Sequence, residues 1–177
     1  MKRPTIFFLP GLITFLLTLP LTSCDDGQTN ERKPFGNCRY GAPKAIFNAT
    51  IPKIEQHTFE LHTQSAIELV SFDGGIDLEL IQSGCEKPKQ EFQFTLSTNT
   101  KSFKDGDWLA SAVDMFGFMG NLAPELQPFL LWQGALKDRF EQLKIGQPQA
   151  LEAGYFVKID KIAGEDSGTL LVTLYQE

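Results

Sequence analysis

Apolar and polar residues alternate along the first half of the chain, as they do in strands with one buried face. The alternation predicts strands at residues 45–51, 57–62, 66–72, 76–81 and 92–96. Asp73-Gly74-Gly75 is a strong turn signal between the third and fourth runs, and it predicts a β-hairpin there. The first half is therefore predicted to be an antiparallel meander.

The apolar spacing changes to a helical period in the middle of the chain. A first helix is expected to start at an Asp107 cap and to end at Gly117 and Gly120. A second helix is expected to open at Pro124 or Pro128. Its apolar stripe repeats every three or four residues, at Phe129, Trp132, Leu136, Phe140 and Leu143.

Strand patterns return at residues 155–159 and 169–175, which flank a loop at 164–168 and predict a C-terminal hairpin. The order of elements predicts an α+β fold. We expect an antiparallel sheet of about six strands, a meander plus the C-terminal hairpin. Two helices are inserted before the hairpin and pack on one face of the sheet.

The N-terminal segment has the pattern of a secretory signal. Met1-Lys2-Arg3 is basic, and residues 6–21 are mostly apolar but interrupted by prolines and a glycine. Leu21-Thr22-Ser23-Cys24 follows, an apolar residue and two small ones before a cysteine. This motif resembles the lipobox of bacterial lipoproteins. The alternatives are an ordinary cleaved signal followed by a free Cys24, or an uncleaved anchor.

The resemblance implies that Cys24 becomes the acylated first residue of the mature protein. Residues 1–23 are then a cleaved signal peptide, 24–37 a lipidated flexible tether, and 38–177 a single α+β domain. The expected location is the bacterial cell envelope. Asp25 and Asp26 resemble an inner-membrane retention signal of enteric bacteria, or a surface-export signal of other bacterial groups. The choice of membrane and leaflet therefore stays open.

The charge of the chain argues against one class of partner. The chain has 16 Lys and Arg against 22 Asp and Glu. Lys2 and Arg3 leave with the signal peptide, so 14 basic residues remain and the net charge becomes −8. Such a domain repels the phosphates of nucleic acids and of anionic lipids. We therefore expect no nucleic-acid partner and a membrane link through the lipid on Cys24.

Two cysteines remain once Cys24 carries lipid. An even remainder in an oxidising compartment usually pairs. We therefore predict a Cys38–Cys85 disulfide that joins the start of the domain to the end of a hairpin strand. The alternative is a reactive thiol at Cys85, but no pattern of basic residues indicates an activated thiolate there.

Candidate catalytic residues are few. Glu60, Asp77 and Glu79 could act as hydrolase carboxylates, although solvated acids on a hairpin are far commoner than a tuned acid–base pair. His57, Glu60 and His62 have metal-ligand chemistry, but only two of them share a strand face, and zinc needs three or four ligands. We expect these residues on a solvent face, with no metal and no cofactor.

The run from Trp108 to Met119 is apolar or small nearly all round, so a helix there must be covered on more than one side. One explanation is a core helix between the sheet and the second helix, and buried stripes far outnumber pockets. The other is an apolar groove lined by Trp108, Phe116, Phe118 and Met119, for a small apolar ligand or an envelope protein.

These observations favour a non-catalytic binding or accessory module of the cell envelope over an enzyme. Small anchored lysozyme inhibitors are similar in size, acidity and disulfide use, so an inhibitor is one candidate role. A periplasmic or surface hydrolase that uses carboxylates of the first sheet is the main alternative. A structural or spacer lipoprotein is the other.

Overall fold

The computed structural model describes residues 35, 36 and 38–177. The expected signal peptide, the expected lipidation residue Cys24 and nearly all of the expected tether lie outside the described residues. Among the described residues, no helix is long and apolar enough to span a membrane.

The first half of the domain is an antiparallel meander, as predicted. Its four strands are β1 (Ile54–Leu61), β2 (Ser65–Phe72), β3 (Ile76–Ser83) and β4 (Lys89–Leu96). The predicted hairpin turn joins β2 to β3, and both Gly74 and Gly75 have positive φ. Glycine accepts this backbone conformation without steric cost.

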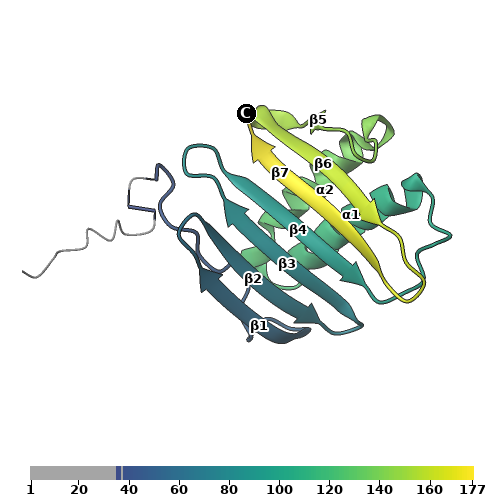
Figure 1. Cartoon of the computed structure of the whole chain (residues 1–177), viewed down its shortest axis with the longest axis horizontal. Coiled ribbons are helices and arrows are strands. Elements are labelled where there is room, and N and C mark those ends of the chain that lie inside the picture. Colours follow the sequence, from purple (N-terminus) through teal and green to yellow (C-terminus); the bar gives the residue numbers. More distant parts are fainter. Residues whose placement is uncertain (1–34, 37) are drawn as a thin grey trace, which may run out of the picture. The chain divides into compact units, whose positions relative to one another are not determined.

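The second half adds a hairpin to the meander. It consists of β6 (Tyr155–Ile162) and β7 (Gly168–Gln176), with a two-residue strand β5 (Gln149–Ala150) beside β6. The strand order is β1-β2-β3-β4-β7-β6-β5, and every neighbouring pair is antiparallel (Figure 1). The α+β prediction is confirmed, and the sheet has seven strands where about six were expected. The two-residue β5 is too short to leave an alternating pattern.

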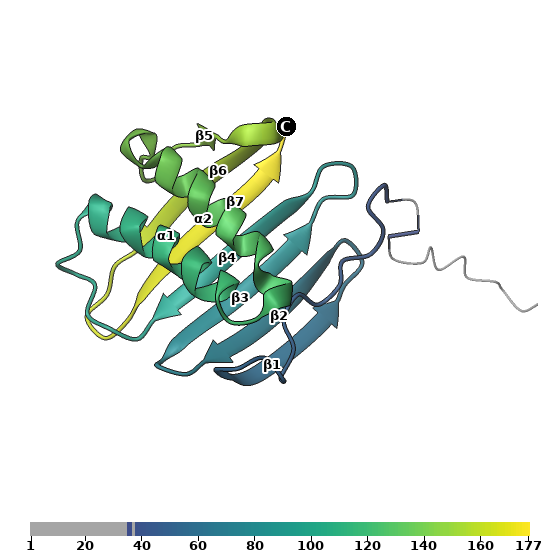
Figure 2. The same cartoon turned by 180° about the vertical axis from the view of Figure 1, so that it is seen from behind.

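Two helices cover one face of this sheet (Figure 2). They are α1 (Asp105–Gly120) and α2 (Pro128–Asp138). A 3-10 turn at Pro124–Leu126 lies between them. The core lies between the helices and alternate residues of the strands. Its central members include Leu78, Leu80, Phe92, Phe94, Phe116, Phe129 and Val172.

α1 ends at Gly120, as predicted, but the start of α1 and the end of α2 differ from the sequence prediction. α1 begins two residues before Asp107, whose carboxylate accepts the backbone N–H of Lys104 (2.7 Å). Gly117 does not end α1: a Cβ there would lie 2.0 Å from Nε2 of Gln133 on α2. This glycine therefore allows close helix packing. α2 ends at Asp138, and Phe140 falls in a separate 3-10 turn.

The strand predicted at residues 45–51 does not form. This segment is a loop with a turn closed by the backbone N–H of Ile51 on the carbonyl of Asn48 (3.2 Å). Phe47 and Ile51 are nevertheless buried in the core. The apolar residues that suggested a strand therefore do pack inside, but in a loop.

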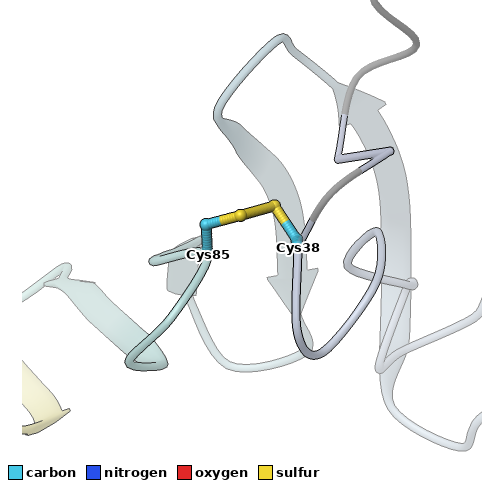
Figure 3. Close-up of a disulfide and its surroundings, with 2 residues drawn as sticks. All are labelled: Cys38 and Cys85. Carbon is cyan, nitrogen blue, oxygen red and sulfur yellow. A yellow bond between two sulfur atoms is a disulfide. The ribbon is translucent and has the colours of Figure 1, made fainter.

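The predicted disulfide joins Cys38 and Cys85, whose Cα atoms are 4.6 Å apart (Figure 3). Cys85 follows the end of β3, in the turn toward β4. The bridge therefore ties the first described segment to this turn. The two cysteines are 47 positions apart in the sequence. Closing a loop of this length stabilises a fold by roughly 4 kcal/mol in the chain-entropy model.

A buried threonine holds the β6–β7 loop to the segment after β4. The backbone N–H of Thr100 donates to the carbonyl of Gly164 (3.0 Å), and the N–H of Gly164 donates to Oγ1 of Thr100 (3.0 Å). Thr100 is fully buried. A Cβ on Gly168 would lie 2.2 Å from that same Oγ1, so only glycine fits at the start of β7.

Candidate functional site

An open apolar hollow of about 600 Å³ lies over the outer side of α2. One wall is α2, and the other is the segment of residues 152–155, which leads into β6. We call it the α2 hollow. Its main apolar lining residues are Pro128, Leu130, Leu131, Trp132, Ala135 and Tyr155. A concave apolar surface of this kind is the usual form of a binding site.

An aromatic pair joins the two walls of the α2 hollow. The rings of Trp132 and Tyr155 meet edge to face, with centroids 5.0 Å apart. Trp132 belongs to the predicted apolar stripe, but Leu131 is one position away and points about 100° from it around the helix. Leu131 is consequently 76% exposed, the most exposed of the large apolar residues in the described part of the chain. Trp132 and Tyr155 thus support a surface from which Leu131 projects.

The second wall contains a strained residue. Ala153 has φ 56° and ψ 29°, a left-handed conformation that is unfavourable for residues with a Cβ. The backbone N–H of Leu151 donates to the carbonyl of Tyr155 (2.7 Å) and closes the turn around it. Strain of this kind persists only where the surrounding structure imposes it, and it is often found at binding sites.

Two carboxylates stand at the rim of the α2 hollow. Asp138 is the last residue of α2, and Glu152 opens the opposite wall. Both are exposed, and neither pairs with a cation among the described residues. The nearby Arg139 instead donates to Gln142 (3.2 Å). The hollow therefore combines an apolar floor with a negative rim.

The four residues of the expected apolar groove lie elsewhere. Trp108, Phe116 and Met119 are fully buried in the core. Phe118 is partly buried, with its ring edge to face against Phe72 (centroids 5.2 Å). It also borders a smaller hollow of about 200 Å³ at the end of α1. These positions correspond to the core alternative, and the open apolar surface is on α2 instead.

A buried carboxylate, Glu68, is the most unusual polar group of the domain. It lies on β2 among the core-facing residues and is 0% exposed. Its oxygens accept the backbone N–H groups of Ile46 (3.1 and 3.0 Å) and Phe47 (2.8 Å). Nε2 of His57 lies 2.8 Å from Oε1. Both oxygens of Glu68 therefore have hydrogen-bond partners inside the domain, as a buried polar group requires.

Glu68 therefore acts as a latch for the loop at residues 45–51. It explains why that loop is not a strand, since its first N–H groups bond to a side chain instead of a neighbouring strand. The latch places Phe47 between the rings of Phe72 and Phe129, at 5.9 and 5.8 Å. His57, 14% exposed, is a half-buried partner on the core side of β1 and not the solvent-face residue we expected. The latch is a packing device.

The candidate metal and hydrolase residues do not converge. Glu60 and His62 are mostly exposed and 3.7 Å apart, while His57 faces the core. In the described residues, no group of three or more potential metal ligands gathers. Asp77 and Glu79 share the sheet face opposite the helices and border a shallow hollow of about 240 Å³. Glu60 is two strands away, about 10 Å across the sheet.

Comparisons with known protein families, with characterised proteins and with solved structures find no match to this chain. The α2 hollow was not predicted from the sequence. Leu131 and Tyr155 are 24 positions apart, and a single exposed leucine in a helix carries no signal by itself.

Proposed function

We propose that the chain is a lipid-anchored lipoprotein of the bacterial cell envelope, whose mature domain is a binding or accessory module. The anchoring part is carried by one observation, the motif Leu21-Thr22-Ser23-Cys24 where the apolar segment ends. The Cys38–Cys85 disulfide supports it, since structural disulfides persist in oxidising compartments and are rare in the cytosol.

Intact-mass spectrometry on the protein from its native host tests the anchor. The expected product begins at Cys24 and carries the added mass of several acyl chains, which together hold a protein on a bilayer more firmly than one. The Cys24→Ser variant, with Cys38 and Cys85 untouched, is the matched control and should remain unacylated. A wild-type product that retains Met1 and carries no lipid would refute the anchor.

The binding role is supported by the α2 hollow, because a concave apolar surface open to solvent is the usual form of a binding site. A photo-crosslinking amino acid placed at Leu131 in living host cells tests it. We expect a discrete covalent adduct from position 131 and none from Ile162, an equally apolar position that is 70% exposed elsewhere on the domain. Adduct patterns that do not differ between the two positions would contradict a binding role for the hollow.

A further inference from the structure

The chemistry of the α2 hollow defines what would fit it. Its floor is apolar and its rim carries Asp138 and Glu152, without a cation partner among the described residues. We propose that the hollow binds a protein segment that presents an apolar side chain next to a basic residue. This inference rests on the proposed binding role and names the class of partner.

The shape of the hollow favours a protein segment over an enclosed small molecule. The hollow is not enclosed but open to solvent, so a small ligand would keep much of its surface in water. An apolar side chain projecting from a partner needs only a shallow site. Tryptophan and tyrosine contribute much of the affinity at such contacts, and the hollow presents Trp132 and Tyr155. Leucine does so less often, but Leu131 is the most exposed of the large apolar side chains of the hollow.

The rim supplies specificity. Asp138 and Glu152 lie at two different walls, so a basic group beside the apolar anchor would meet a negative charge from either side. An acidic segment would instead be repelled by both, and also by the net charge of −8 that remains without Lys2 and Arg3. Binding of the same apolar anchor is therefore favoured by a basic residue next to it in the partner segment and disfavoured by an acidic one.

The rigidity of the site lowers the cost of binding. The aromatic pair of Trp132 and Tyr155 crosses the hollow, and the bond from Leu151 to Tyr155 fixes the turn around Ala153. A site whose walls are already held in place loses little conformational entropy when a partner binds. A short segment with one anchor and one basic residue can therefore bind without the hollow reshaping itself.

Selection from a random library of phage-displayed peptides, on the protein purified from its host, tests the inference. We expect enriched peptides to carry Leu, Phe or Trp beside Lys or Arg. Leu131→Ser should weaken their binding about tenfold, as expected for an exposed anchor. Ile162→Ser, the same kind of change at an exposed apolar residue outside the hollow, should leave binding unchanged.

Charge variants separate this inference from the binding role itself. Asp138→Asn with Glu152→Gln should weaken the basic peptides about three- to tenfold and leave neutral apolar peptides unaffected. Enriched peptides that depend on Leu131 but carry no basic residue would overturn the partner class and keep the binding role. Enriched peptides indifferent to Leu131 would overturn both.

A second copy of the chain is the other occupant to test, because it carries an aromatic side chain next to a basic residue. Tyr40 is exposed, and the guanidinium carbon of Arg39 lies 5.5 Å from the centroid of its ring. Sedimentation velocity over a range of protein concentrations measures it. We expect a concentration-independent monomer. Self-association that is lost in both Leu131→Ser and Tyr40→Ser would replace the separate partner with this chain and overturn the proposal.

Discussion

Removing the buried carboxylate of Glu68 is expected to release the loop at residues 45–51. In Glu68→Ala, the N–H groups of Ile46 and Phe47 and the imidazole of His57 all lose their acceptor. Phe47, only 2% exposed, also loses the restraint that holds it between Phe72 and Phe129. The perturbation therefore combines unpaired polar groups with weakened packing.

The magnitude follows from the number and type of these bonds. A buried polar group left without its hydrogen-bond partner costs about 1–3 kcal/mol, and three groups lose theirs in Glu68→Ala. The bonds share one carboxylate and do not add. We expect Glu68→Ala to lower the free energy of unfolding by about 3–5 kcal/mol. His57→Ala should cost about 1–2 kcal/mol, because the backbone N–H groups still bond to the carboxylate.

Urea unfolding followed by tryptophan fluorescence measures the free energies, and hydrogen exchange reports on the loop. The amide of Phe47 should lose its protection in Glu68→Ala while amides of β4 keep theirs. Glu60→Ala, at an exposed carboxylate on the neighbouring strand, is the control and should stay within about 0.5 kcal/mol of wild type. If Glu68→Ala fails to fold, Glu68→Gln and His57→Ala give the same comparison. A Glu68→Ala protein of wild-type stability with a protected Phe47 amide would refute the latch.

Four other variants test how single positions contribute to stability. Cys38→Ser with Cys85→Ser should lower the free energy of unfolding by about 2–4 kcal/mol in urea, and reducing the wild type should reproduce that loss; equal stability with and without reductant would contradict it. Gly168→Ala should destabilise by about 1–3 kcal/mol, since its Cβ meets the buried Thr100. Gly134→Ala, with open space around its Cβ in the middle of α2, should instead stabilise by about 0.5–1 kcal/mol. Leu131→Ser should leave the free energy of unfolding in urea within about 0.5 kcal/mol of wild type, because the side chain is exposed.

The sequence predicted those elements whose signal is local. Alternation located β1 to β4 and the C-terminal hairpin, and the helical period located α1 and the start of α2. The disulfide followed from counting cysteines. These features depend on neighbouring residues or on chemistry that needs no coordinates.

The failures have one physical cause, which is a contact with a distant residue. The run at 45–51 has strand composition, but its backbone bonds to Glu68, 21 and 22 positions away. Glu68 itself was missed because β2 carries apolar residues on both faces, so alternation does not show which face is buried. Gly117 was interpreted as a helix end, whereas α2 uses its missing side chain as space. The α2 hollow likewise needs two segments that only the fold brings together.

The position of β7 determines when the sheet can become fully paired. β7 lies between β4 and β6, so the strand that comes last in chain order is an interior strand of the sheet. Until residues 168–176 arrive, β4 has no partner on that side and the hydrophobic layer beneath it stays open. Loss of β7 alone would leave two separate half-sheets with unpaired edges, prone to aggregation.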